Sequence, residues 1–262
     1  MRQLVEAGAD IAITDSRGVV EDVFSPLHYA FASDVDSDAK AAYLTQRSAS
    51  SQPATDGSEQ EVLGPEFYST SLRLAARLNQ ADRVRALIDD HGASVNATDW
   101  RDRTALHFAA EAGSAEAVSV LVQHPFILIQ ISDPLLDVGC TPLHLAAWEG
   151  HADAVNVLVQ HPRCHVNTTG TNGWTALHHA AYDGNLDCVK VLVSHTSCDV
   201  SITDYRDRTA ADLARERGHD DIVALLEAKS TGNFAVYLQE LSCFTILQAQ
   251  FIVVSLLTLS IG

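Results

Sequence analysis

Apolar residues between positions 118 and 193 recur at the spacing that places them on one face of an α-helix. Three stretches show this i, i+3, i+4 pattern, with these residues: Val118, Leu121 and Val122, then Val155, Leu158 and Val159, then Val189, Leu192 and Val193. The pattern predicts three amphipathic helices with similar apolar stripes. No such helix can bury its stripe alone, so the sequence favours similar units that stack and share one core.

A short motif before each stripe predicts a further helix. Three copies are nearly identical: Thr104-Ala105-Leu106-His107, Thr141-Pro142-Leu143-His144 and Thr175-Ala176-Leu177-His178. An alanine pair and a glycine follow each copy. Diverged copies begin at Thr70 and Thr209, which makes the five starting threonines 34, 37, 34 and 34 residues apart. A sixth, more distant copy begins at Ser25. The chain is therefore built from repeats.

The residue types of the motif fit a helix–turn–helix unit. A threonine before a helix can cap its open N–H groups. Proline in the first turn, as at Pro142, loses no donor that the helix needs. The alanine pair lets helices approach closely, and a glycine such as Gly150 can adopt the left-handed conformation that ends a helix. Each repeat is thus expected to hold two short helices.

The T-P-L-H pattern with its alanine pair and glycine resembles the ankyrin-repeat family. The match is good over residues 67–228 and poor over residues 1–46. The resemblance implies an all-α solenoid of about five to six helix-turn-helix repeats with hairpin loops. It also implies that the motif histidines hydrogen-bond the turns between neighbouring repeats. These histidines are His28, His107, His144 and His178.

The repeats divide the chain into four expected parts. Residues 1–46 are expected to form degenerate or partial repeats, and residues 47–64 a flexible insertion rich in acids and serine. Residues 65–229 are the expected ankyrin-repeat domain, and residues 230–262 a hydrophobic C-terminal tail. Residues 4–10 resemble the end of a second helix, which indicates a fragment, a misassigned start or a half-repeat cap.

The composition excludes several classes of function. The 262 residues include 34 acids and 17 bases, for a formal net charge of -17. Such a chain repels phosphate backbones and shows no basic stripe, so nucleic acid is not an expected partner. The five cysteines lack the spacing of a secreted disulfide framework, and residues 1–10 lack the apolar core expected of a signal peptide. We expect free thiols and a cytoplasmic location.

Motifs for catalysis and cofactors are missing from the sequence. It has no P-loop, no G-x-G-x-x-G, no H-E-x-x-H and no nucleophile elbow, so we expect neither enzyme activity nor a cofactor. His161, Cys164 and His165 have loosely metal-like spacing, with Cys188 and Cys198 one repeat further on. A zinc site needs about four converging ligands. Because the repeat pattern already explains these residues, no metal site is predicted.

Asn96 and Asn167, in two predicted hairpins, have three interpretations. Both match the glycosylation sequon, although no secretory signal accompanies it. The second interpretation, hydroxylation, is implied by the resemblance, since an asparagine that follows an apolar residue in an ankyrin hairpin can be a substrate of asparaginyl hydroxylase. Val95-Asn96 and Val166-Asn167 resemble that site. The third interpretation is an unmodified, turn-forming asparagine.

The family's variable recognition positions lie on the hairpins and on the open side of each first helix. By resemblance, those positions hold the following residues: Trp100, Arg101, Arg103, Glu111, Trp148, Glu149, Trp174, Tyr182, Asp183, Tyr205, Arg206 and Arg208. All three tryptophans belong to this set, and Trp, Tyr and Arg dominate binding hot spots. We predict that this face binds a protein; the alternative is that the rings pack only against adjacent repeats.

Two features depart from the family pattern. Asp102 and Asp207 replace the usual turn glycine, and aspartate tolerates the left-handed turn moderately well. The loop before Thr141 is longer than its counterparts and carries an apolar finger at residues 126–131. This finger either folds back on the stack or offers a binding edge.

The C-terminal tail also has three interpretations. Residues 241–262 hold no charged residue, and a helix of that length with a rise of about 1.5 Å per residue would span a hydrocarbon core of about 30 Å. Against an anchor, Gln248 and Gln250 dilute the run and no Lys or Arg cluster flanks it. The tail is a membrane anchor, a cap on the last repeat or a gene-model extension.

Taken together, these patterns favour a non-enzymatic module that binds another protein through a concave hairpin-and-helix face. One alternative is a regulatory ankyrin segment of a larger enzyme or channel. A second is an adaptor attached to a membrane through residues 241–262.

Overall fold

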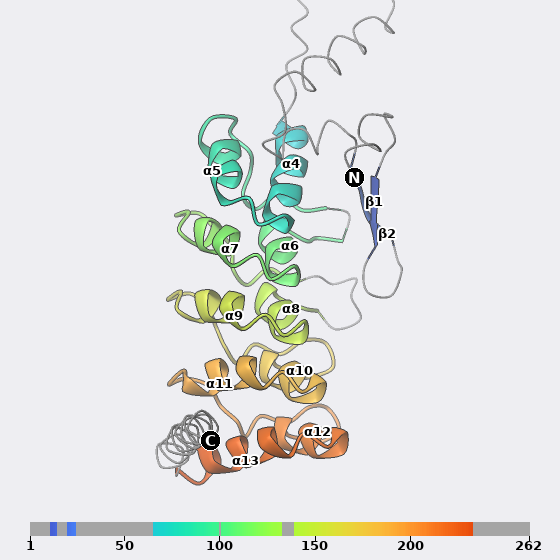
Figure 1. The fold of residues 1–262 in the computed structure, drawn as a ribbon, viewed down its shortest axis with the longest axis vertical. Helices are drawn as coiled ribbons and strands as arrows, with labels where there is room; N and C mark the ends of the chain where they lie inside the picture. The colour runs from blue at the N-terminus through green and yellow to red at the C-terminus, as the bar shows by residue number, and fades with distance from the viewer. Residues whose placement is uncertain (1–10, 15–19, 25–64, 100, 133–138, 233–262) are drawn as a thin grey trace, which may run out of the picture.

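The computed structural model describes residues 11–14, 20–24, 65–99, 101–132 and 139–232 (Figure 1). Ten helices account for most of them, and they form five consecutive pairs. The pairs are α4 (Pro65–Arg77) with α5 (Ala81–Asp89), α6 (Ala105–Glu111) with α7 (Ala115–Val122), α8 (Pro142–Trp148) with α9 (Ala152–Val159), α10 (Ala176–Asp183) with α11 (Leu186–Ser194), and α12 (Ala210–Arg217) with α13 (Asp220–Ser230). The predicted all-α solenoid is confirmed.

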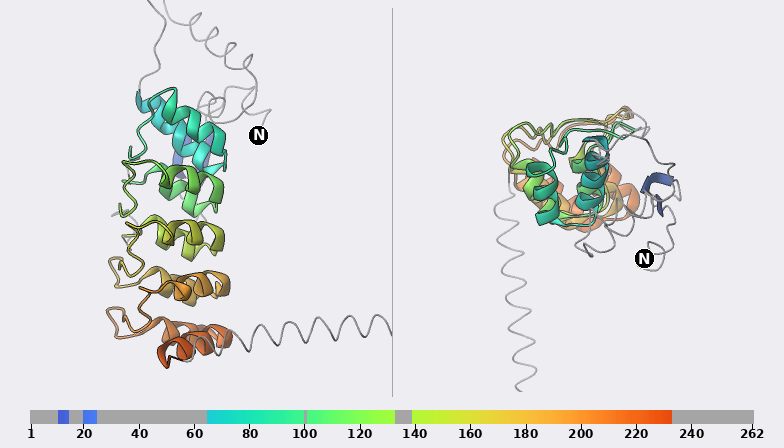
Figure 2. Two further views of the ribbon diagram at one scale, coloured as in Figure 1. Left: turned by 90° about the vertical axis from the view of Figure 1, so that its left-hand side faces the viewer. Right: turned by 90° about the horizontal axis from the view of Figure 1, so that it is seen from above.

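The five pairs stack as layers in chain order (Figures 1 and 2). The first helices α4, α6, α8, α10 and α12 pack one on the next in one column. The second helices α5, α7, α9, α11 and α13 form a parallel column beside them. Because each layer contacts only its neighbours, the stability of this array depends on the interfaces between repeats.

The core lies between the layers and is formed by the predicted apolar stripes. Val118, Leu121, Val155 and Leu158 are fully buried, and one continuous cluster of buried side chains extends from α4 to α13. Val122 is only partly buried. The alanine pairs of the first helices are also buried, which allows these short helices to pack closely.

The turn inside each pair needs a residue with positive φ. Gly184 ends α10 with φ 80°, in the left-handed conformation. A Cβ at Gly184 would lie only 2.5 Å from the ring of His219 in the next layer. Any other residue would therefore disturb the contact between the last two repeats, in addition to its backbone strain.

Single side chains link neighbouring layers at these turns. The His151 Nε2–H donates to the Glu111 carbonyl at 3.0 Å. Asn185 donates to the carbonyls of Ala147 and Trp148 at 3.0 and 2.8 Å. These bonds satisfy carbonyls at the C-terminal ends of the first helices, which have no partner within the helix.

Near the N-terminus the structure describes a short antiparallel pair of strands. β1 (Ile11–Thr14) pairs with β2 (Val20–Phe24), with Ile11 opposite Phe24 and an irregularity after Ile13. This pair precedes Ser25, the start of the most distant motif, just as the hairpin loops precede the later motifs. The rest of residues 1–46, the insertion 47–64 and residues 233–262 of the predicted tail lie outside the described residues, so the predicted division into domains stays a prediction.

Among the described residues, no helix combines the length and the apolar character that crossing a bilayer requires.

Candidate functional site

Each first helix that carries the full motif is capped by the histidine three residues after its threonine. The Thr141 N–H donates to Nδ1 of His144 at 3.2 Å, and the His144 Nε2–H donates to the carbonyl of Trp174 in the next repeat at 3.2 Å. Because a backbone N–H can only donate, Nδ1 must accept and the ring proton lies on Nε2. His178 likewise caps Thr175 and bonds the next hairpin. The predicted link between repeats is confirmed for His144 and His178.

Four rings gather where α8 and α10 pack together, and we call Trp148, Trp174, His179 and Tyr182 the aromatic cluster. His179 stacks on Trp148 with centroids 5.0 Å apart and planes inclined by 22°. Trp174 meets the same imidazole edge-on at 5.0 Å and lies 5.1 Å from Tyr182. Trp148, Trp174 and Tyr182 are half-buried, as expected for residues on an open face. The partial exposure predicted for Trp148 and Trp174 is therefore confirmed.

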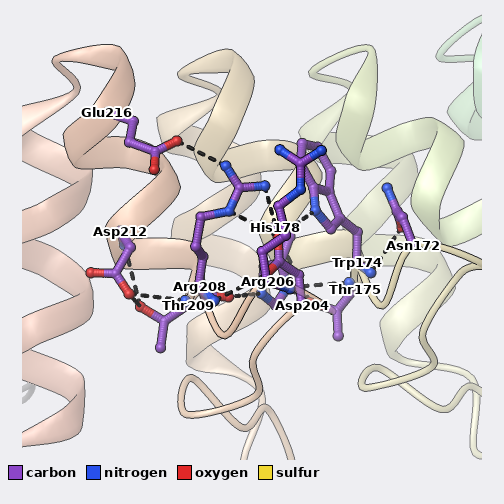
Figure 3. Close-up of polar contacts among 10 residues, drawn as sticks. All are labelled: Asn172, Trp174, Thr175, His178, Asp204, Arg206, Arg208, Thr209, Asp212 and Glu216. Carbon is purple, nitrogen blue, oxygen red and sulfur yellow. Dashed lines mark hydrogen bonds and ion pairs between the residues drawn. The ribbon is translucent and has the colours of Figure 1, made fainter.

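The hairpin before α12 holds the indole of Trp174 in place (Figure 3). The Trp174 Nε1–H donates to Asp204 Oδ2 at 3.1 Å. The same carboxylate accepts from Arg208 Nη2 at 2.8 Å and from the backbone N–H of Arg206 at 2.9 Å. Asp204 is only 4% exposed. One buried carboxylate thus orients a ring of one repeat and an arginine of the next.

These bonds also determine the charge of Asp204. Burial by itself would raise the pKa of this carboxyl, since it disfavours the charged form. The hydrogen bonds from Arg208, from the Arg206 backbone and from Trp174 outweigh burial and hold the pKa of Asp204 well below its ordinary range. Asp204 is therefore ionised at neutral pH.

Exposed residues of the same hairpin extend the surface beyond the aromatic cluster. Tyr205 is 75% exposed and lies beside Gly173, where a Cβ would come within 3.0 Å of the Tyr205 ring. Arg206 is exposed, and Arg208 is partly exposed and pairs with Glu216 at 2.9 Å. These positions present an aromatic ring and two cations at the end of the described stack.

Charged residues also border the cluster on the first helices. Glu149 and Asp183 are exposed at the C-terminal ends of α8 and α10. The Arg217 guanidinium lies over the Tyr182 ring, 4.5 Å from its centroid. Although Asp183 is exposed at the surface, desolvation by its neighbours raises the pKa of its carboxyl, while the charges of Arg217 and His219 act in the opposite direction.

The prediction needs correction in the N-terminal part of the set. Arg101 and Arg103 are only 5% and 1% exposed. Arg103 pairs with the buried carboxylate of Asp99 at 3.0 Å, and with Glu111 at 3.6 Å. A partner could not reach the two arginines without opening the stack. Glu111, at 19% side-chain exposure, also pairs with Arg77. Trp100 lies outside the described residues.

The sequence reasoning missed His179. It occupies the position that holds Leu74, Phe108, Leu145 and Leu213 in the other four repeats with a described first helix. A polar residue at a position that is otherwise apolar was the signal that could have identified it. The side chain is 2% exposed, so it belongs to the interior beneath the surface.

The two hairpin asparagines connect neighbouring repeats. The Asn96 amide donates to the carbonyl of Phe126 at 2.7 Å and accepts from the Leu128 N–H at 2.9 Å. Asn167 makes the same pair of bonds with Ser197 and Asp199. The structure thus favours a structural role for both amides, and their modification stays a prediction.

Buried and exposed side chains alternate along the apolar finger. Ile127 and Ile129 are 1% and 4% exposed and join the core, whereas Phe126 and Leu128 are 74% and 51% exposed. The expectation that the finger folds back is therefore confirmed for Ile127 and Ile129, whereas binding through the exposed Phe126 and Leu128 stays a prediction.

The histidines and the cysteine with metal-like spacing line an open hollow of about 370 Å³ between two turns. Burial raises the pKa of Cys164 to about 11, so at neutral pH it is a thiol and not the thiolate that zinc binds. Within the described ranges, no three His, Cys, Asp or Glu side chains are grouped as metal ligands would be. The hollow has no metal-site geometry.

Comparison with known proteins agrees with this architecture. A family model described as ankyrin repeats in three copies matches residues 72–170 and 162–234. A search of curated proteins found no match. Ankyrin repeats are in general protein-binding modules and are typically non-catalytic. With more than half of its length matched and five stacked helix pairs described, the chain belongs to the ankyrin-repeat family.

Proposed function

We propose that the chain binds a partner protein through the surface formed by the aromatic cluster and the hairpin before α12. The observation that carries this proposal is the partly exposed pair Trp148 and Trp174, held by His179 and Asp204. Large rings that are fixed in place lose little entropy on binding, and such residues dominate binding energies. The exposed or partly exposed residues of this surface are Trp148, Glu149, Trp174, Tyr182, Asp183, Tyr205, Arg206 and Arg208.

Capture of partners by the full chain and by single variants tests the proposal. Trp148→Ala should weaken binding of the captured partner by about 2 kcal/mol, or about thirtyfold, as loss of a hot-spot ring does. Truncation of a core tryptophan costs about 3–5 kcal/mol. Because Trp148 is half-buried, its replacement should lower the free energy of unfolding by less than that.

Phe126→Ala is the matched control, since it removes an exposed ring from a turn outside this surface. The partner should bind this variant as it binds the unaltered chain. Equal losses for the two variants, or no loss for Trp148→Ala, would contradict the proposed surface.

A further inference from the structure

His179 differs from its counterparts in the other repeats. The equivalent positions hold the apolar residues Leu74, Phe108, Leu145 and Leu213, all buried. His179 is just as buried, at 2% exposure, and its Nε2 has no hydrogen-bond partner. A buried polar atom without a partner is costly. Neither hydrogen bonding nor the need to fill this space therefore explains why the position holds an imidazole.

The ring contacts of His179 are all with residues of the surface or directly beneath it. One face stacks on Trp148, and Trp174 meets the ring edge-on, both at 5.0 Å. His144 meets it edge-on at 5.8 Å. Trp148 and Trp174 come from two different repeats, and His179 lies between them. An aliphatic side chain would fill the same space but would have no flat face to fix the inclination of the indoles.

We infer that His179 is the positioning residue of the proposed binding surface: its neutral ring sets the orientations of the Trp148 and Trp174 indoles. The inference rests on the proposed function for its consequence in binding, but the orientation of the rings can be tested without a partner.

The surroundings favour the neutral imidazole. His144 of α8 and His178 of α10, once they are protonated, would repel a positive charge on this ring. Asp204, in the hairpin before α12, is already paired with Arg208 and Trp174. Stacking on Trp148 would favour a cation, but burial without a partner outweighs it, and burial followed by the two neighbouring histidines lowers the pKa of His179 to about 3.

Two substitutions separate the flat ring from the volume that it fills. His179→Phe keeps an aromatic ring, as at Phe108, and His179→Leu inserts the residue found at Leu145 and Leu213. Both residues are already accommodated at this position in other repeats, so both variants should fold. Phe108→Leu is the matched control, because it makes the same aromatic-to-leucine change two repeats away.

Near-ultraviolet circular dichroism of the full chain at pH 7 reports how the indoles are held. His179→Leu should alter the tryptophan bands, whereas His179→Phe and Phe108→Leu should leave them close to those of the unaltered chain. Acid also distinguishes the unaltered chain from both His179 variants. As the pH is lowered from 6.5 to 4, the folding equilibrium constant of the unaltered chain should fall more steeply, by an additional factor of up to about ten per pH unit. Tryptophan bands that are unchanged in His179→Leu, or altered equally in both variants, would overturn the inference.

Affinity for the captured partner then tests the consequence. His179→Leu should weaken binding by about tenfold or more, as expected when hot-spot rings are misplaced, and His179→Phe by less than about threefold. Altered bands in His179→Leu with unchanged affinity would support the positioning role and contradict only the proposed surface.

Discussion

Two hairpins of this chain have the same local structure but different surroundings. In residues 99–103 of an inner repeat and in residues 204–208 of the last described repeat, an aspartate accepts the backbone N–H groups of the second and fourth residues after it. Asp102 and Asp207 occupy the left-handed region, with φ 59° and 58°. The two turns are therefore formed by the same local interactions.

Burial distinguishes the two hairpins. The Arg103 side chain is 2% exposed, whereas that of Arg208 is 24% exposed. Their glutamate partners differ in the same way, with Glu111 at 19% and Glu216 at 52%. The inner hairpin has described layers on both sides, and in the described part of the chain none follows α13. The comparison shows that local sequence sets a turn, whereas the position in the stack decides whether its charges are interior or on the surface.

The residue that caps the first helix also differs between the two repeats. In the inner repeat, the Thr104 N–H donates to the buried imidazole of His107 at 3.1 Å. In the last one, the Thr209 N–H donates to the carboxylate of Asp212 at 3.0 Å. Both side chains satisfy the same backbone group, but they titrate in different pH ranges. The two repeats should therefore respond differently to acid.

Removing the aspartate of each hairpin should have the largest effect. Asp99→Ala leaves the Arg103 guanidinium buried without its main partner, and should lower the free energy of unfolding by about 3–5 kcal/mol. Asp204→Ala should cost less, about 1–3 kcal/mol, because Arg208 can regain water while the Trp174 indole loses its acceptor. Urea denaturation of both variants measures the difference, and equal losses would contradict the contrast in burial.

Acid should destabilise the inner repeat at a higher pH than the last described repeat. Burial lowers the pKa of native His107 to about 4, whereas in the unfolded chain this histidine keeps its ordinary pKa of 6.5. The stability due to neutral His107 is thus complete above pH 6.5 and falls as the pH drops from 6.5 towards 4. At pH 5 the loss should be about 2 kcal/mol.

The carboxylate of Asp212, which caps the first helix of the last described repeat, titrates at a lower pH than His107. The hydrogen bonds from the Thr209 side chain and backbone lower the pKa of Asp212 below its ordinary 3.8, so its contribution is lost only below that pH. Hydrogen-exchange protection factors at pH 7 and pH 5 should therefore fall for α6 more than for α12. A uniform fall across both helices would mean that the caps do not control the response to acid.

Replacing the left-handed aspartates should have a smaller effect, and an equal one. Asp102→Gly and Asp207→Gly relieve the strain of a positive φ, and each should raise the free energy of unfolding by about 0.5–1 kcal/mol. Thermal unfolding of both variants provides the measurement. Unequal gains would show that the two turns differ in backbone strain as well as in burial.

The outer ion pair should have the smallest effect. Glu216→Gln removes the 2.9 Å contact with Arg208, and with both groups open to water the loss should be about 0.2–1 kcal/mol. Raising the salt concentration should reduce the stability difference between this variant and the unaltered chain, because exposed pairs are screened. A difference that persists in about 1 M salt would indicate that this pair, too, is shielded from solvent.

Much of the architecture could be predicted because the signals are local. The spacing of the motifs fixed the order of the helix pairs, and residues such as Thr141 and His144 cap a helix through contacts only three residues apart. Apolar stripes at i, i+3 and i+4 likewise identified buried positions such as Val155 and Leu158. Each of these features repeats from one unit to the next, so every copy supported the same interpretation.

The candidate site was only partly predictable, because its members come from different repeats. The sequence identified Trp148 and Trp174 as residues of the open face, but it did not indicate that His179 lies between them. It also assigned Arg103 and Arg208 the same role, since both stand directly before the threonine of their motif. Nothing within either hairpin distinguishes a buried arginine from an exposed one.

The sequence by itself determined the repeat unit, its helix caps and its turns, because these depend on residues a few positions apart along the chain. The tertiary structure alone decided which charges are buried and which rings meet. Both depend on the layer that packs against a residue, roughly 30 residues away in sequence, and burial controls the energy of a charge far more strongly than its local neighbours do.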